Sequence, residues 1–250
     1  MLAALFLDTN SGEESRMNQT LSEEELLHRK EKLGLLAAKR KLDSWGYKNL
    51  ADFHGGAHEC EFVSPNTKTA GNVASDIFVA LQDWASEDVL TGPVNLETVR
   101  LGYTPGMPTD DNLITLLEEH FGLTLCDIYA TNAFPFIKPG SISSQIPPKV
   151  LRRAAEVFCL PQIRVIAPRL VIALGLDCFN ALSEALGMRR AARLETAISN
   201  PIDDGGTRVW CQAHTGHWGE INRGGKARVS EDWRTMANWY NGPQGAKHAA

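Results

Sequence analysis

The chain has 250 residues, of which 43% are hydrophobic and 22% charged, and its formal net charge is −5. These values fit an ordinary soluble globular protein with a substantial core, and they exclude a wholly basic nucleic-acid-binding protein. A local basic groove remains compatible with them, because charges attract phosphate within a Debye length of ~8–10 Å. The apolar opening 1–7 is too short for a membrane span and lacks the basic leader of a signal peptide, so we expect a cytoplasmic protein that does not bind membranes.

The first 20 residues are polar, and we expect them to be frayed. Ser22 and Glu25 form a capping-box pattern, and the leucines that follow at helical spacing predict an amphipathic helix that ends near Trp45. Residues 46–74 are rich in Gly, His, Asn and Pro and are predicted to be loop. The expected organisation is an N-terminal helical extension and loop at 1–60, an α/β domain at 61–241 and a disordered tail at 242–250.

From residue 76 onward, strand and helix patterns alternate. Strands are predicted at 77–81, 128–131, 169–175 and 209–213, a long Gly/Pro loop at 85–109, and helices capped by Asp110, opened by Pro147 and Pro148, following Gly175, and at 231–240. This order predicts a three-layer α/β/α fold with a four-stranded, mainly parallel sheet.

Three of the predicted strands end in polar groups: Asp83, Asn132 and His214. A parallel sheet presents side chains at the carboxyl ends of its strands, where such groups meet in one cleft. A carboxylate, an amide and an imidazole together are suited to activating water, reading a flat heterocycle and stabilising a leaving anion. Each also has a structural interpretation: a helix or turn cap for Asp83, an Asx turn for Asn132 and a buried core histidine for His214.

A rival site is the run of His54, His58 and Cys60, whose spacing suits zinc but which lacks an evident fourth ligand. A loop with two ordinary histidines is the simpler interpretation. The five cysteines include no CxxC pair, and three of them lie in or beside apolar runs, which favours buried thiols. We therefore expect no metal and no cofactor.

Over roughly residues 60–240, these segments resemble the uracil-DNA glycosylase superfamily. Ile128-Tyr-Ala-Thr-Asn132-Ala looks like its strand with the base-reading asparagine, and the helix-then-strand segment 159–175 is the most diagnostic match. His214-Thr-Gly-His-Trp is similar to its histidine motif, and Gln82-Asp83 to the Gln-Asp pair of its water-activating motif.

The sequence also departs from the family pattern. Leu81 replaces the glycine before Gln-Asp, Trp84-Ala85 replaces the Pro-Tyr after it, and Thr215 replaces the proline after the histidine. In the family that tyrosine excludes thymine, so in a gapless alignment Ala85 opens the wall of the pocket, unless Trp84 swings in to refill it. Cys159 stands where an iron–sulfur branch has one ligand, but its partner cysteines are missing, so no cluster is expected.

The resemblance implies a monofunctional DNA glycosylase that breaks an N-glycosidic bond and leaves an abasic site. Asp83 would position water, Asn132 would read the pyrimidine edge, and His214 would donate to the leaving base, with His217 as the alternative donor. Further members of the base pocket would be Gln82, Trp84, Ala85 and Phe134.

Groups around the cleft would contact duplex DNA with an extruded base, or a single strand, from a protein monomer. They are Lys138, Ser143, Ser144, Trp218, Ile221, Arg223 and Lys226. No lysine stands obviously at the site, so lyase chemistry is not expected. The substrate is uracil or, through an enlarged pocket, a 5-modified cytosine such as viral DNA carries, which would make the protein a defence enzyme. The alternatives are an inactive lesion-binding protein of the same fold and a zinc protein.

Overall fold

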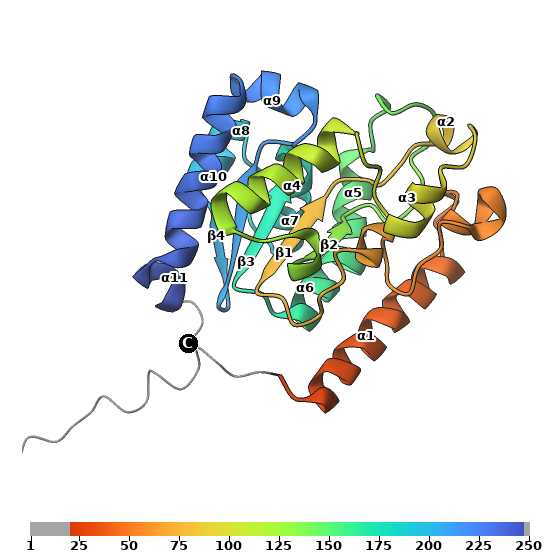
Figure 1. The fold of residues 1–250 in the computed structure, drawn as a ribbon, viewed down its shortest axis with the longest axis horizontal. Helices are drawn as coiled ribbons and strands as arrows, with labels where there is room; N and C mark the ends of the chain where they lie inside the picture. The colour runs from red at the N-terminus through yellow and green to blue at the C-terminus, as the bar shows by residue number, and fades with distance from the viewer. Residues whose placement is uncertain (1–20, 248–250) are drawn as a thin grey trace, which may run out of the picture.

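The computed structural model describes residues 21–247, and these form an α/β fold around a five-stranded sheet (Figure 1). The strands are β1 (Ile77–Leu81), β2 (Tyr129–Asn132), β3 (Leu170–Leu174), β4 (Ile202–Asp204) and β5 (Thr207–Gln212). Their order is β2-β1-β3-β5-β4, in which the first four are parallel and β4 is an antiparallel edge strand. The chain therefore reverses its winding direction between β1 and β3, which is where open α/β sheets place their ligands.

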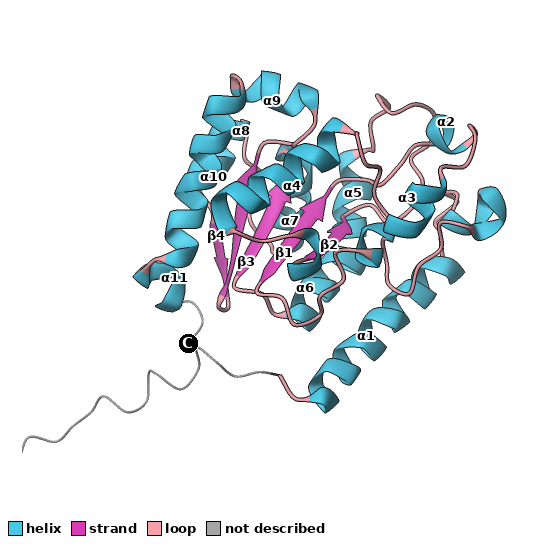
Figure 2. Cartoon of the chain, viewed as in Figure 1, coloured by secondary structure: helices cyan, strands magenta, loops and turns pink. Residues whose placement is uncertain are grey.

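Helices lie on both faces of the sheet (Figure 2). Those of the described residues are α1 (Glu23–Leu42), α2 (Glu87–Leu90), α3 (Leu96–Leu101), α4 (Pro108–Phe121), α5 (Pro148–Ala154), α6 (Leu160–Ile166), α7 (Leu176–Ala185), α8 (Leu194–Ser199), α9 (His217–Arg223), α10 (Lys226–Asn241) and α11 (Pro243–Lys247). A π-helical turn, Ala155–Cys159, joins α5 to α6.

Alternation along the strands divides the core into two layers. Phe78 and Ala80 of β1 pack with the layer that includes α1, α5, α6 and α7. Ile77, Val79 and Leu81 pack on the opposite face with α4 and α10. Because successive strand residues point to opposite faces, both faces of β1 are buried, and the result is the predicted three-layer arrangement.

The four predicted strands are confirmed with shifted ends, but the sheet has a fifth strand that the sequence analysis missed. β4 is a short edge strand without an apolar run, and it pairs with β5 across the turn at Gly205 and Gly206. Both glycines have positive φ, 56° and 94°, as a two-residue hairpin turn requires.

The capping box of α1 is confirmed, since the Ser22 hydroxyl accepts from the backbone N–H of Glu25 and the Glu25 carboxylate accepts from the backbone N–H of Ser22. The helix ends at Leu42 and packs through Leu33 and Ala37 onto the main body. Arg40 is fully buried and donates to Glu59. The N-terminal helix therefore shares the core of the α/β domain.

Three other predictions need correction. The 85–109 stretch is not all loop, because it contains α2 and α3. Helix α4 begins at Pro108, with Asp110 inside its first turn, and α10 begins at Lys226. Residues 243–247 of the expected disordered tail form α11. Residues 248–250 and residues 1–20, which were expected to be frayed, lie outside the described residues. No helix in the described part of the chain is long and apolar enough to cross a membrane.

Candidate functional site

The three polar groups predicted at strand ends meet at the carboxyl edge of the sheet. Leu81 and Asn132 are register partners, so Asp83 follows β1 directly beside the end of β2. Gln212 of β5 pairs with Leu174 of β3 at the same edge, two residues before His214.

Asn132 and His214 also belong to the same face of the sheet. Ala130, two residues before Asn132, packs in the α4 and α10 layer. His214 lines a groove together with residues of α4 and α10, the helices of the same layer. The backbones of β2 and β5 are three interstrand spacings apart, about 14 Å.

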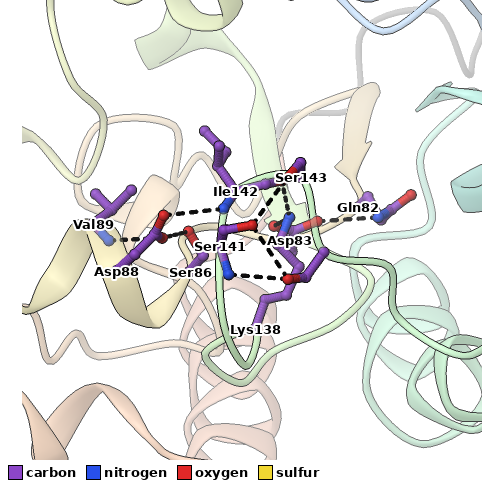
Figure 3. Close-up of polar contacts among 10 residues, drawn as sticks. Gln82, Asp83, Ser86, Asp88, Val89, Lys138, Ser141, Ile142 and Ser143 are labelled. Atoms are coloured by element: carbon purple, nitrogen blue, oxygen red, sulfur yellow. Dashed lines mark hydrogen bonds and ion pairs between the residues drawn. The ribbon is translucent and has the colours of Figure 1, made fainter.

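Asp83 forms a largely buried ion pair with Lys138. Their atoms Oδ2 and Nζ are 3.0 Å apart, and the side chains are 15% and 5% exposed. The Gln82 amide donates to Oδ1 of the same carboxylate at 3.1 Å. Figure 3 shows the carboxylate between these two side chains. Lys138 was expected at the surface as a phosphate contact, and the structure corrects this, because its ammonium is buried against Asp83.

His214 is held as a neutral hydrogen-bond donor. Its Nδ1 accepts from the backbone N–H of Gly216 at 3.0 Å, which leaves the ring proton on Nε2. Burial lowers the pKa of His214 below its usual 6.5, and the charge of Lys138 lowers it further, whereas Asp83 raises it. The charges of both Asp83 and Lys138 therefore influence the pKa of the His214 ring.

The loop that carries His214 is fixed to the start of α4. The Thr215 hydroxyl donates to the Thr109 carbonyl at 2.7 Å, and the Asn112 amide donates to the Thr215 carbonyl at 2.7 Å. Threonine thus makes a contact that the family's proline cannot make. Gly216 and Gly219 are required for close packing, because a Cβ would lie 3.0 Å from His214 Nδ1 and 1.9 Å from the His214 carbonyl oxygen, respectively.

Asn132 is almost completely buried, and only the oxygen of its side-chain amide has a hydrogen-bond partner. Its Oδ1 accepts from the Ser64 hydroxyl at 2.5 Å, while Nδ2 has no hydrogen-bond partner among the described residues. An unsatisfied buried donor costs about 1–3 kcal/mol. Structures that retain such a group commonly do so because a ligand or water supplies its partner.

The other predicted base-pocket residues do not gather around one pocket in the structure. The Trp84 indole donates to the Gly102 carbonyl at 2.8 Å, its ring lies 5.0 Å from that of His58, and Trp84 and Ala85 pack against the same apolar cluster. Phe134 is fully buried against Tyr47 and is part of the core, which corrects its assignment as a stacking surface. His217 is exposed, at 5.6 Å from the Trp218 ring.

The predicted DNA contacts divide into free and occupied groups. Trp218 and Ile221 of α9 are 73% and 49% exposed, and Lys226 is exposed. Arg223 is not free for phosphate, because its guanidinium is paired with the buried Asp232, and the prediction is corrected on this point.

The two serines of the loop after β2 also differ. Ser143 is exposed and shares a hydrogen bond with Ser141, whereas the Ser144 hydroxyl accepts from the Ser141 backbone N–H at 2.9 Å. The Ser144 hydroxyl therefore closes its own turn. That leaves Ser143 as the freer of the two hydroxyls.

A groove of about 120 Å³ opens beside His214 between α4, α9 and α10. It is lined by Asn112, Thr115, Leu116, Glu119, His214, Thr215, Glu220, Lys226, Val229 and Ser230. Lys226 and Glu220 set opposite charges at this groove.

The rival zinc site does not form. Within residues 21–247, no three His, Cys, Asp or Glu side chains are arranged to hold a metal. Burial raises the pKa of the Cys60 thiol to about 11, which opposes the thiolate form that binds zinc. Burial, and then the charges of His54 and Lys68, lowers the pKa of His58.

Sequence reasoning missed Ser64 and the position of Lys138. Ser64 lies in a segment expected to be plain loop, 68 residues before its partner Asn132. Lys138 gave a usable signal, since it follows Asn132 by only six residues in the loop after β2. In comparisons with known protein families and with curated proteins, the chain matches none of them.

Proposed function

We propose that this protein is a DNA glycosylase that hydrolyses the N-glycosidic bond of a non-standard pyrimidine, in a divergent uracil-DNA-glycosylase-like fold. The observation that carries the proposal is the unpartnered, buried Nδ2 of Asn132, at the same edge of the sheet as His214. A pyrimidine bound at this edge would accept from Asn132 Nδ2 at one atom of its ring edge and from the Nε2–H of His214 at a different carbonyl oxygen.

The site suits the charges that develop when the bond breaks. The departing base becomes an anion, and fixed donors in a dry pocket are the main means of stabilising it. His214 supplies such a donor in its neutral form, because its pKa is lowered by burial. Asp83 stands where a carboxylate would orient water toward the sugar cation.

The surface around the proposed site has side chains that suit the binding of DNA with an extruded base. Trp218 and Ile221 stand exposed on the helix that follows the His214 loop, and apolar side chains of this kind wedge between base steps. Extrusion of the base costs a few kcal/mol, which such a wedge and a close-fitting pocket offset.

A 5-modified pyrimidine is the substrate that we favour over uracil. The small Ala85 stands where the family has a blocking tyrosine, and Trp84 is held away by Gly102 and His58. An alanine at that position is smaller than a tyrosine ring, and this difference supports a preference for a 5-substituted base.

The test uses duplexes that each contain one uracil, thymine, 5-hydroxymethylcytosine or glucosylated 5-hydroxymethylcytosine, scored for alkali-labile abasic sites. We expect cleavage at one or more modified bases, and loss of it in Asn132→Ala. Cleavage confined to uracil would contradict the enlarged pocket, and absence of abasic sites on every duplex would contradict the glycosylase proposal.

One observation favours a second candidate, a lesion-binding protein without turnover. The Asp83 carboxylate is already neutralised by Lys138, which weakens it as a base for water. That candidate predicts tight binding to lesion duplexes without product, unchanged by Asp83→Asn.

A further inference from the structure

Lys138 is placed in the site by its backbone. Its N–H donates to the Ala85 carbonyl at 3.1 Å, and its carbonyl accepts from the Glu87 N–H at 3.0 Å. The loop after β2 is thereby fixed along the loop after β1, and the side chain runs inward to Asp83 (Figure 3). Lysine is among the residues least often buried, so a 5% exposed ammonium at this edge needs a reason.

The contacts of the ammonium leave it partly free. It is 3.0 Å from Asp83 Oδ2 and 2.7 Å from the Ile142 carbonyl oxygen. An ammonium has three N–H donors, so two acceptors leave one N–H for a ligand. Burial of the pair costs several kcal/mol per ion before their attraction is counted, so the pair is weak evidence for a purely stabilising role.

The pair belongs to the proposed site rather than to a remote structural bridge. Asp83 follows β1 beside Asn132 at the end of β2, and the charges of Asp83 and Lys138 both act on His214, the proposed donor to the leaving base. By contrast, Lys48 makes an equally short pair with Glu87, 3.0 Å, but its side chain is 56% exposed. A desolvated lysine with a neighbouring group that can accept its proton is suited to nucleophilic attack on a carbonyl carbon.

From this geometry we infer that Lys138 is an amine nucleophile toward the C1′ aldehyde of abasic DNA, so the site has lyase activity in addition to base excision. The inference rests on the proposed function for its substrate, and it replaces the expectation of a monofunctional enzyme.

The chemistry balances with water alone. A proton moves from Lys138 Nζ to Asp83, and the amine lone pair forms a bond to C1′. The former aldehyde oxygen then takes up two protons, one from the bonded nitrogen and one returned by Asp83. Loss of that oxygen as water gives a C1′=Nζ iminium. The C2′ proton then leaves to a base, its electron pair forms a C2′=C3′ double bond, and the C3′–O bond breaks to release the 3′ phosphate. Hydrolysis of the imine regenerates the lysine.

The test uses the full chain and a duplex with a preformed abasic site, so that it does not depend on base excision. Sodium borohydride reduces an imine to a stable amine and leaves protein joined to DNA. We expect a covalent product with the wild type, and mass spectrometry of its peptides should locate the adduct at Lys138.

Two variants separate the role of Lys138 as a nucleophile from its role in the ion pair. Lys138→Arg keeps the charge beside Asp83 but cannot be deprotonated, so trapping should fall by more than ~10-fold. Lys48→Gln, which removes an exposed lysine of the same region, should trap like the wild type. Circular dichroism of each variant verifies folding.

No adduct with the wild type, an adduct at another amine, or undiminished trapping by folded Lys138→Arg would each overturn the inference. Abasic-site formation without trapping would leave the proposed glycosylase intact and remove the lyase. Trapping without excision of any tested base would leave the lyase intact and contradict the proposed glycosylase.

Discussion

Gly216 donates its backbone N–H to Nδ1 of His214 at 3.0 Å, and this bond determines which nitrogen of the neutral ring carries the proton. The Nε2–H is therefore the donor that the ring presents to the site. Because His214 lies within the fields of Asp83 and Lys138, its titration reports on that pair.

The first prediction concerns the pKa of His214, measured by NMR titration of the imidazole. Lys138→Gln removes a positive charge that lowers this pKa, so the value should rise toward 6.5. Asp83→Asn removes a negative charge that raises it, so the value should fall. The pKa of His120, which is influenced by Glu119 and Arg234 instead, should not move in either variant. Shifts of His214 in the same direction for both variants would contradict the proposed arrangement.

The second prediction is that Gly216→Ala impairs base excision by displacing the ring. A Cβ there would lie 2.8 Å from Thr109 Oγ1 and 3.0 Å from His214 Nδ1. Loss of one preorganised donor to a developing anion lowers turnover by roughly 10²–10³-fold, and we expect a loss of that order. The control is Gly34→Ala on α1, where a Cβ meets open space and the helix gains about 0.5–1 kcal/mol. Equal single-turnover rates for the two variants would show that ring position is unimportant.

The sequence predicted the parts of the site that follow from strand periodicity. Asp83, Asn132 and His214 each come directly after a buried run, and parallel strands bring such ends to one edge.

Long-range side-chain contacts were not predictable in the same way. Nothing near Ser64 signals that its hydroxyl reaches Asn132, and nothing near Arg223 signals its pairing with Asp232. The edge strand β4 was missed because its three residues, of which none is fully buried, carry no hydrophobic pattern. Its Gly205-Gly206 turn was the signal that could have revealed it.

The third prediction separates the function of Asn132 from its effect on stability. Its Nδ2 is buried without a partner, so the similarly shaped Asn132→Leu removes an unsatisfied donor. Ser64 retains a second acceptor, Asn66 Oδ1 at 3.0 Å. We expect excision to be lost while the free energy of unfolding stays within about 1 kcal/mol or rises. Urea unfolding and abasic-site assays measure the two effects, and a large loss of stability would mean that the amide serves the fold.

The fourth prediction is a loss of stability on mild acidification. The pKa values of His58, His120 and His214 all lie below 6.5 in the folded chain, chiefly because of burial. As the pH falls through 6.5, the unfolded chain takes up protons that the folded chain does not, so the free energy of unfolding decreases. Between its pKa in the folded chain and its pKa in the unfolded chain, each histidine changes the free energy of unfolding by up to about 1.4 kcal/mol per pH unit.

His58→Phe isolates one contribution to that slope. The ring packs against Trp84, and its buried Nδ1 has no partner, so a phenyl ring sacrifices no hydrogen bond at that atom. Urea unfolding from pH 7 to 5 should show a shallower decline in the variant. His28→Phe, at a 63% exposed position, is the matched control and should follow the wild type. A decline as steep in His58→Phe as in the wild type would refute this account.

The fifth prediction tests whether α9 supplies the wedge for base extrusion. Trp218 is 73% exposed, so its removal should not affect folding. If the indole fills the space left by an extruded base, Trp218→Ala should slow excision from a paired duplex, where unstacking costs a few kcal/mol, far more than from a single strand, where that cost is small. Leu35→Ala, at a 70% exposed position on α1, should leave both rates unchanged. An equal loss on both substrates would instead assign Trp218 to the base pocket, because a pocket contact acts on the base whether or not it was paired.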